Sequence, residues 1–558
     1  MLYTIVDAAE FTYPDRMEYP TASDRILLDA PRNALATFQI LIAGLCANHT
    51  KANWLPDTIY TDDTLRKQAA VGFPRVDGVS IRTDLPYEVE WYTLVPVTVE
   101  RNQALTADMF KPHFPEREAP YRVYDCLRPF DGTLDVGVGD GRTPDTDIGG
   151  LYGAIRIPVD AEPGSYTATV EITVGEDAVT IPVLLTVYRA AVPAEESLTV
   201  VQTYLGTDTA KYHNVPYGSE EFERLDAAYL RAMRRMRQNM MSVGGVRVTE
   251  LGENRYEFDF SVMEATMRRY LAAGFQCFKG ISLGRRQSWS ASTILVYDGK
   301  LPAMSYEGYC YLSQYLPALH AMLERNGWLG RYIMSVSDEP NDCNCTEFRA
   351  LCGLIRKIVP DIPLVDAMSY GNLHGALDIW VPLNAEYDKH MREIETLRAN
   401  GDEIWHYVCC VPRGEEYINR FTDYALLATR YLFWGNFKYN LAGYLHWAVN
   451  RYQPGQDPFR QSCPEHRNAD SVGFLPAGDT HLLYPGEDGP WISMRGENQR
   501  ESAEEYEMLR VLAGKDRPKA EEICAKVFHS FRDVEYDVTA FRSARRELLQ
   551  ALSEIDSL

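Results

Sequence analysis

The stretch Arg331-Tyr332-Ile333-Met334-Ser335-Val336-Ser337-Asp338-Glu339-Pro340 gives the first indication of the fold. Its short run of Tyr, Ile, Met and Val, bounded by polar residues, is typical of a fully buried strand in a parallel sheet. The run ends in two adjacent carboxylates, and Pro340 stops the strand. Folds with parallel sheets keep their chemistry at this end of the strands. We therefore expect Asp338 and Glu339 to be catalytic, the alternative being acids that merely precede a helix.

Outward from this stretch, apolar strands alternate with amphipathic helices over residues 198–515. This alternation predicts a (β/α)₈ barrel of the TIM type with insertions. A helix is expected at about 416–434, and a closing helix at 497–514. The eight expected strands are 198–204, 240–248, 276–283, 331–336, 363–368, 378–383, 404–411 and 443–449.

The flanking regions have different patterns. Residues 1–192 alternate apolar and polar side chains with a period of two, most clearly in the expected hairpin 166–174 and 179–187, which predicts a β-sandwich domain. Residues 516–558 are expected to be a short helical extension of two amphipathic helices. The fold class is thus a multidomain protein, with an N-terminal β-sandwich (1–192), a barrel catalytic domain (198–515) and a C-terminal helical extension (516–558).

Composition excludes several classes of partner. The 558 residues carry a formal net charge of −23, which disfavours nucleic acid and anionic membranes as partners. No apolar stretch approaches the length of a membrane span. The start, Met1-Leu2-Tyr3-Thr4-Ile5-Val6-Asp7, has no basic region before its apolar run, and the 11 Cys are scattered. These features predict a cytoplasmic protein with reduced thiols, and they leave open whether it is a homo-oligomer.

The ends of the later strands supply further candidate site residues. A set of carboxylates and aromatic rings suits a sugar, because its apolar faces stack on rings and its hydroxyl groups need acceptors. For Trp405, Tyr407 and Trp447, the alternative is that the ring only packs in the protein interior. The expected substrate is an oligosaccharide or glycoside. The candidate substrate-binding residues are Asn384, Glu386, Trp405, Tyr407, Trp447 and Asn450.

The adjacency of the two acids bears on the mechanism. A retaining glycosidase of the usual kind needs two carboxylates about 5 to 5.5 Å apart that flank the scissile bond. In a barrel these come from two strands, and the seventh strand ends in Cys409-Cys410-Val411-Pro412, without an acid. Adjacent acids suit a different scheme, in which the substrate's own 2-acetamido oxygen attacks the anomeric carbon.

At this point the chain resembles glycoside hydrolase family 123. The resemblance lies in Ser337-Asp338-Glu339-Pro340, in the runs 405–410 and 443–450, in Asp457-Pro458 and Leu483-Tyr484-Pro485, and in the run 493–500. It implies a retaining β-N-acetylgalactosaminidase with a β-sandwich before the barrel. Asp338 would stabilise the acetamido group, and Glu339 would be the general acid and base. His406 and Met494-Arg495-Gly496 depart from the family pattern, which raises the prospect of a shifted specificity.

Other chemistries have weaker support. Cys343, Cys345 and Cys352 lie close together, but no second Cys or His cluster is placed to complete a zinc site. The sequence has no glycine-rich phosphate loop. We therefore expect no metal and no cofactor. Two alternatives stay open: a glycosidase of a sugar without an acetamido group, with Asp338 or Glu386 as base, and a non-catalytic carbohydrate-binding protein.

Overall fold

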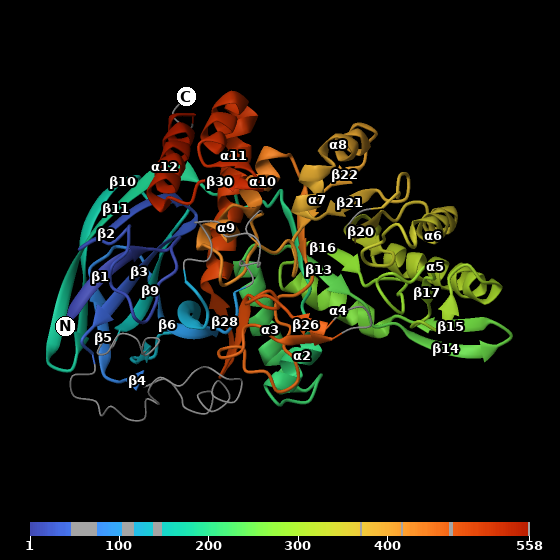
Figure 1. Cartoon of the computed structure of the whole chain (residues 1–558), viewed down its shortest axis with the longest axis horizontal. Coiled ribbons are helices and arrows are strands. Elements are labelled where there is room, and N and C mark those ends of the chain that lie inside the picture. The colour runs from blue at the N-terminus through green and yellow to red at the C-terminus, as the bar shows by residue number, and fades with distance from the viewer. Residues whose placement is uncertain are drawn as a thin grey trace.

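A computed structural model describes residues 1–45, 75–102, 117–137, 148–368, 371–414, 417–467 and 472–555. Two groups of strands dominate it, one at each side of the molecule in Figure 1. The chain begins in the blue group and passes into the green and orange group. The red helices of the C-terminal region return to the side of the first group.

The N-terminal residues form two sheets. One has the strand order β1-β3-β9-β6-β7-β28-β27, in which β27 (Leu483–Gly486) and β28 (Gly489–Ser493) come from a much later part of the chain. The other has the order β2-β11-β10-β5. A shared apolar core includes Phe38 and Ile40 from the first sheet and Val170 and Ile181 from the second. The strands are β1 (Leu2–Asp7), β2 (Ile26–Arg32), β3 (Ala34–Ala43), β4 (Arg75–Val76), β5 (Val79–Thr83), β6 (Val89–Val99), β7 (Tyr121–Pro129), β8 (Leu134–Gly137), β9 (Ile148–Ile157), β10 (Gly164–Val174) and β11 (Asp177–Ala191).

The expected hairpin is present as β10 and β11, which pair antiparallel from Gly164 with Val187 to Val174 with Asp177. Ala168, Val170 and Ile172 are buried, as their spacing of two residues predicts. Alternation along a strand places every second side chain on the same face, so the buried face was readable from the sequence.

The second group of strands forms a barrel-like sheet of parallel strands. Successive strands of this sheet pair in parallel from β12 to β22, β23 pairs with β24, and β24 pairs back with β12. The sheet therefore closes through the one strand that is divided into β22 and β23. Each of the eight predicted strands contains a strand of this sheet. The second ends at Val243, because residues 247–248 belong to the separate strand β14 (Arg247–Gly252), and the seventh is divided into β22 and β23. They are β12 (Thr199–Gln202), β13 (Met240–Val243), β16 (Cys277–Gly280), β19 (Tyr332–Ser335), β20 (Leu364–Met368), β21 (Ile379–Pro382), β22 (Glu403–Ile404), β23 (His406–Tyr407) and β24 (Gly443–His446).

Helices and small hairpins connect these strands. The hairpins are β14 (Arg247–Gly252) with β15 (Arg255–Asp259), β17 (Leu295–Val296) with β18 (Leu301–Pro302), β25 (Glu465–Arg467) with β26 (Val472–Phe474), and β29 (Phe528–Ser530) with β30 (Asp533–Val534). A 3₁₀ turn, η1, covers Leu329–Arg331. The helices are α2 (Gly206–Tyr212), α3 (Glu220–Arg235), α4 (Ser261–Ala272), α5 (Tyr306–Arg325), α6 (Cys345–Ile358), α7 (Asn384–Lys389), α8 (Met391–Ala399), α9 (Leu426–Arg430), α10 (Leu432–Lys438), α11 (Met494–Ala525) and α12 (Val538–Ile555). Across the described residues, no helix is both long enough and apolar enough to cross a membrane.

The helix expected at 416–434 is wrong in its first half. Residues 417–425 are not helical, and two short helices, α9 and α10, follow them. The reason lies in buried polar side chains. Arg420 is fully buried and donates hydrogen bonds to the carbonyl oxygens of Ala448 and Asp479. Such contacts with distant segments override the local helical pattern.

The closing helix expected at 497–514 lies inside α11, which continues to Ala525 through a kink at Asp516 (φ −142°, ψ 81°). The C-terminal region therefore contains the end of α11 and the separate helix α12. The hairpin of β29 and β30, which the sequence analysis did not predict, joins them.

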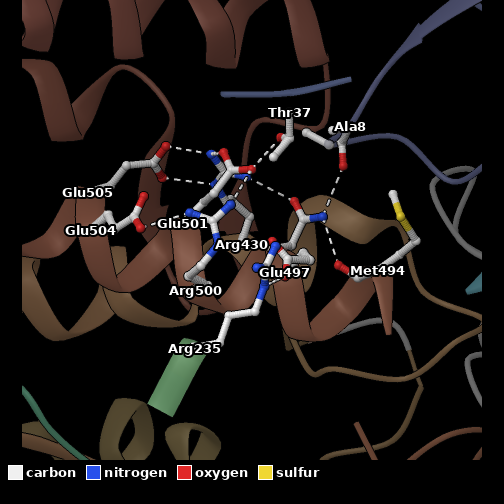
Figure 2. Close-up of polar contacts among 12 residues, drawn as sticks. Ala8, Thr37, Arg235, Arg430, Met494, Glu497, Arg500, Glu501, Glu504 and Glu505 are labelled. Atoms are coloured by element: carbon white, nitrogen blue, oxygen red, sulfur yellow. Dashed lines mark hydrogen bonds and ion pairs between the residues drawn. The ribbon is translucent and has the colours of Figure 1, made fainter. Parts of the chain in front are cut away.

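The N-terminal sheets and the barrel-like sheet are held together by α11 and two strands before it. β27 (Leu483–Gly486) and β28 (Gly489–Ser493) extend the first N-terminal sheet, because β28 pairs with β7. Figure 2 shows side chains of α11 converging on Arg430 of α9. The Arg430 guanidinium contacts Glu501 (2.5 Å) and Glu505 (2.7 Å), and Thr37 of β3 donates to Glu501 (2.6 Å).

Candidate active site

The acids singled out in the sequence lie just beyond the carboxyl end of β19, after Val336 and Ser337. Asp338 and Glu339 both have left-handed backbone conformations, with φ of 43° and 44°. In a regular strand, neighbouring side chains point to opposite faces, but two consecutive left-handed residues break that alternation. The adjacent carboxylates are therefore not forced apart by a pleat. Non-glycine residues rarely adopt this conformation, and such strain gathers at functional sites.

Glu339 is tied to the barrel interior by a tyrosine. The Tyr407 hydroxyl, from β23, donates to Glu339 Oε1 at 2.7 Å. Burial raises the pKa of the half-buried Glu339, and the negative charge of Asp338 raises it further. Hydrogen bonds from Tyr407 and Trp289 and the charge of Arg286 act in the opposite direction, and the pKa remains raised. A carboxyl group in this state suits proton donation.

The loop after β16 holds the same turn from another side. One Arg286 nitrogen donates to the carbonyl oxygens of Asp338 and Glu339, the latter at 3.1 Å. Another Arg286 nitrogen donates to the Trp289 carbonyl oxygen, which also accepts from Asn341 at 2.9 Å. Arg286, Trp289 and Asn341 were not among the residues predicted for the site. They lie in irregular segments, where no periodicity marks a role.

The neighbouring strand β20 supplies a third acid, Asp366, which is 1% exposed. Its carboxylate accepts from the backbone amides of Val336, Ser337 and Asp338 and from the Ser335 hydroxyl. Burial raises the pKa of Asp366 to about 6, although these hydrogen bonds and Lys279 of β16 lower it. Asp366 was not among the predicted site residues, although an acid inside an otherwise apolar strand is a signal that the sequence carries.

Trp447 lies after β24, and a buried polar group holds its indole. Its Nε1 donates to Asp479 Oδ2 at 3.0 Å, and Asp479 Oδ1 lies 3.1 Å from His446 Nε2. Burial and the nearby Arg420 charge lower the pKa of His446 to about 4, so the imidazole is neutral. Arg420 donates to His446 Nδ1 at 2.6 Å, which leaves the proton of the ring on Nε2, facing Asp479. Trp447 is half-buried, so part of its ring is open to a ligand.

The two candidate asparagines are fully buried. Asn384 donates to the Ile418 carbonyl oxygen at 2.8 Å. Asn450 accepts from the Leu205 amide at 2.9 Å and donates to the Thr209 hydroxyl at 2.9 Å. In this structure both side chains connect loops at the carboxyl ends of the strands, and neither faces solvent.

Trp405 and Glu386 also lie apart from the Glu339 carboxylate. Trp405 is 1% exposed, packs in the barrel interior with Val201 and Met240, and donates to Glu403 at 2.5 Å. Glu386 turns along its own helix, α7, where Lys389 Nζ lies 2.9 Å from its carboxylate. Of the predicted residues, the structure brings Asp338, Glu339 and Tyr407 together.

Within the part of the chain that the structure describes, no three or more His, Cys, Asp or Glu side chains lie where they would share a metal ion. Cys343 is exposed, Cys345 is half-buried and Cys352 is buried, and all three are free thiols.

Comparison with known proteins adds a family to this geometry. The model of the glycoside hydrolase 123 catalytic domain matches residues 206–512, more than half of the 558-residue chain. A family 123 glycoside hydrolase from Clostridium perfringens, whose structure was analysed for the details of glycolipid glycan hydrolysis, superposes with a TM-score of 0.71 at 14% identity, over 99% of this chain and 98% of that one. At this identity the likeness concerns the fold alone.

Two further solved structures are less similar. A GH10 xylanase from termite gut with a bacterial Ig-like domain has a TM-score of 0.33 at 10% identity, over 76% of this chain and 95% of that one. The endo-β-1,4-mannanase from Thermotoga petrophila has a TM-score of 0.35 at 11% identity, over 57% and 77%. Among curated proteins, none matches this chain.

Proposed function

The chain belongs to glycoside hydrolase family 123, and we propose that it is a retaining exo-glycosidase that releases terminal β-linked N-acetylgalactosamine. The substrate's 2-acetamido group would act as the nucleophile. One observation carries the proposal: Asp338 and Glu339 are adjacent and share a left-handed turn at the end of β19, where Glu339 meets Tyr407.

In the proposed reaction, Glu339 begins as the proton donor. It protonates the glycosidic oxygen while the acetamido carbonyl oxygen attacks the anomeric carbon, so that the bond to the leaving group breaks and a cyclic intermediate forms. Asp338 accepts a hydrogen bond from the acetamido N–H and stabilises the positive charge that develops there. Glu339, now ionised, takes a proton from a water molecule whose oxygen attacks the anomeric carbon. The bond between the anomeric carbon and the acetamido oxygen then breaks, which releases the sugar with its acetamido group restored and its configuration retained.

The surroundings of Glu339 support both of its tasks. Burial and the Asp338 charge raise its pKa, which keeps the proton available for the first step. The Tyr407 hydroxyl stabilises the carboxylate that the first step leaves behind. We assign substrate contact to Tyr407 and to the half-buried Trp447, with Trp447 as a stacking surface. For Asn384, Asn450, Trp405 and Glu386, a role in binding remains a prediction.

The architecture is assigned in the same way. We propose a (β/α)₈ barrel at 198–515, a β-sandwich at 1–192 and a C-terminal extension at 516–558. The closed order of parallel strands and the shared core of the two N-terminal sheets support this assignment. We further propose that the enzyme works on short oligosaccharides in the cytoplasm.

The first test is release of p-nitrophenol from the β-GalNAc, β-GlcNAc and β-Gal glycosides. We expect a clear preference for β-GalNAc. Glu339→Gln should abolish turnover of β-GalNAc substrates with poor leaving groups and keep some turnover of the activated aryl glycosides. Asp338→Asn should slow the step that forms the cyclic intermediate. Equal rates on the β-Gal glycoside would contradict participation of the acetamido group.

A second substrate probes the nucleophile directly. Replacing the acetamido group by trifluoroacetamido makes the carbonyl oxygen a weaker nucleophile without changing the position of the group. The rate should therefore fall steeply along the acetyl, fluoroacetyl and trifluoroacetyl series. A flat series would point to a nucleophile supplied by the protein.

A further inference from the structure

We propose that Asp366 is a positioning residue for the catalytic turn, because its carboxylate fixes the backbone that presents Asp338 and Glu339. The inference rests on the proposed function, in which these two acids carry the chemistry. Asp366 itself is buried, so it acts through the turn and not on the sugar.

The acceptor capacity of Asp366 is fully used. Oδ1 accepts from the Ser335 hydroxyl at 2.7 Å and from the Asp338 amide at 3.3 Å. Oδ2 accepts from the amides of Val336 and Ser337 at 3.1 and 2.8 Å. An ionised carboxylate offers about four lone-pair sites, and here four donors occupy them. A neutral carboxyl or an amide has one oxygen or nitrogen that carries a proton, so neither can accept all four.

The position of these amides explains why they need an acceptor. β19 pairs with β20 through Met334 with Leu364 and Ser335 with Val365, and the pairing of the two strands ends there. The next three amides of the chain bind to the Asp366 side chain in place of a further strand. Buried backbone N–H groups without a partner are costly. The carboxylate thus accepts the hydrogen bonds of the amides beyond the strand end, where the backbone leaves the sheet.

Opposite charges hold the two sides of the turn. The anionic Asp366 accepts from its amides, and the cationic Arg286 donates to the carbonyl oxygens of Asp338 and Glu339. Consecutive left-handed residues persist only where the surrounding structure enforces them. Asp366 and Arg286 together orient the peptide units and so supply this constraint.

The charge state of Asp366 depends on groups from several elements. Lys279 of β16 favours the ionised form, Asp338 after β19 opposes it, and Cys352 of α6 lies nearby as a thiol. The pKa of Asp366 is raised to about 6 by burial. As the pH falls through this value, Asp366 gains a proton and loses acceptors for the amides. Catalysis should then weaken on the acid side near pH 6.

Asp366→Asn tests the inference, with Asp378→Asn as the matched control. Asp378 also accepts from a backbone amide of β20, that of Leu364 at 2.8 Å, but at the opposite end of the strand, and it pairs with Arg356 at 2.7 Å. Hydrogen exchange of the amides of residues 336–338, measured by NMR or by mass spectrometry with fragmentation, reports the turn without any substrate.

We expect these amides to exchange about 10-fold faster or more in Asp366→Asn, and unchanged in Asp378→Asn. In the β-GalNAc assay, kcat should fall by about 100-fold with KM within a few-fold of wild type, because misplacement of catalytic groups by about 1 Å has this effect. The acid limb near pH 6 should disappear in Asp366→Asn. Ser335→Ala, which removes one of the four bonds and keeps the charge, should give an intermediate loss of kcat.

The outcomes separate the two proposals. Unchanged exchange in Asp366→Asn, or an equal fall of kcat in Asp378→Asn, would overturn the positioning role. If Asp366→Asn does not fold, Ser335→Ala decides, and wild-type exchange and kcat in that variant would overturn the role. A wild-type enzyme without activity on β-GalNAc would refute the proposed function, while the exchange measurement would still decide whether Asp366 fixes the turn.

Discussion

Replacing Tyr407 by Phe should move the alkaline limb of the kcat/KM profile to higher pH. The variant loses the 2.7 Å hydrogen bond to Glu339 and keeps the ring in the barrel interior. The hydroxyl stabilises the ionised carboxylate, so its loss favours the protonated form and raises the pKa of Glu339. The alkaline limb reports the acid of the free enzyme, so activity should persist to higher pH than in wild type.

The magnitude follows from the energy of that bond. A hydrogen bond to a charged group contributes about 1.5 to 3 kcal/mol. Because about 1.4 kcal/mol corresponds to one pH unit, the midpoint of the alkaline limb should rise by about one to two pH units. The second step should slow as well, since the carboxylate that acts as base loses a stabilising donor.

The assay is kcat/KM for the β-GalNAc aryl glycoside between pH 4 and 10, with Tyr444→Phe as control. Tyr444 of β24 is also fully buried, but within the described residues its hydroxyl has no hydrogen-bond partner. The control should keep the wild-type profile. An unchanged or lowered alkaline midpoint in Tyr407→Phe would refute the assignment of Glu339 as the titrating acid.

Three further predictions concern stability. Arg430→Met should lower the free energy of unfolding by about 3 to 5 kcal/mol in denaturant titration, because Glu501 and Glu505 keep buried charges without their main partner; a loss below about 1 kcal/mol would contradict it. Gly443→Ala should lower the melting temperature, because the added methyl group would lie 2.4 Å from the Trp405 ring in the close-packed interior. An unchanged melting temperature would show that the Trp405 ring can move away from the methyl group. Nearby cations lower the pKa values of Glu501 and Glu505 below that of an unfolded Glu, about 4.3. The free energy of unfolding of the wild type should therefore be retained above this pH and fall as the pH drops below it. A free energy of unfolding that does not change in this acid range would show that the pair does not contribute.

The strands of the barrel-like sheet were predictable because burial on both faces requires continuous apolar runs. The run that ends at Ser335 and the run 364–368 illustrate this, since both contain mostly apolar side chains. The position of the acids at a strand end followed from the same pattern. Alternation also placed Trp405 and Tyr407 on one face, but not their depth, and only Tyr407 reaches Glu339.

The contacts that shape the site were not predictable from local patterns. Asp366 meets the amides after β19 because the register sets Ser335 beside Val365, and register between strands far apart in sequence has no local signature. Arg286 acts through an irregular loop. Asn384 and Asn450 have the residue type of sugar ligands, yet each satisfies backbone groups of a loop, a use that composition cannot distinguish.

The pairing of β28 with β7 has a consequence for how this enzyme can be divided. Helix α11 starts directly after β28, and its Arg495 contacts Asp125 of β7 at 2.9 Å with both side chains fully buried. A fragment cut to the matched residues 206–512 would leave β28 without its partner β7 and remove the carboxylate that neutralises the arginine. The catalytic part is therefore not a transferable module. In a gene fusion or a domain exchange, the N-terminal sheet must be included together with the catalytic part. Substitutions on the two sides of this interface are expected to be inherited as a pair.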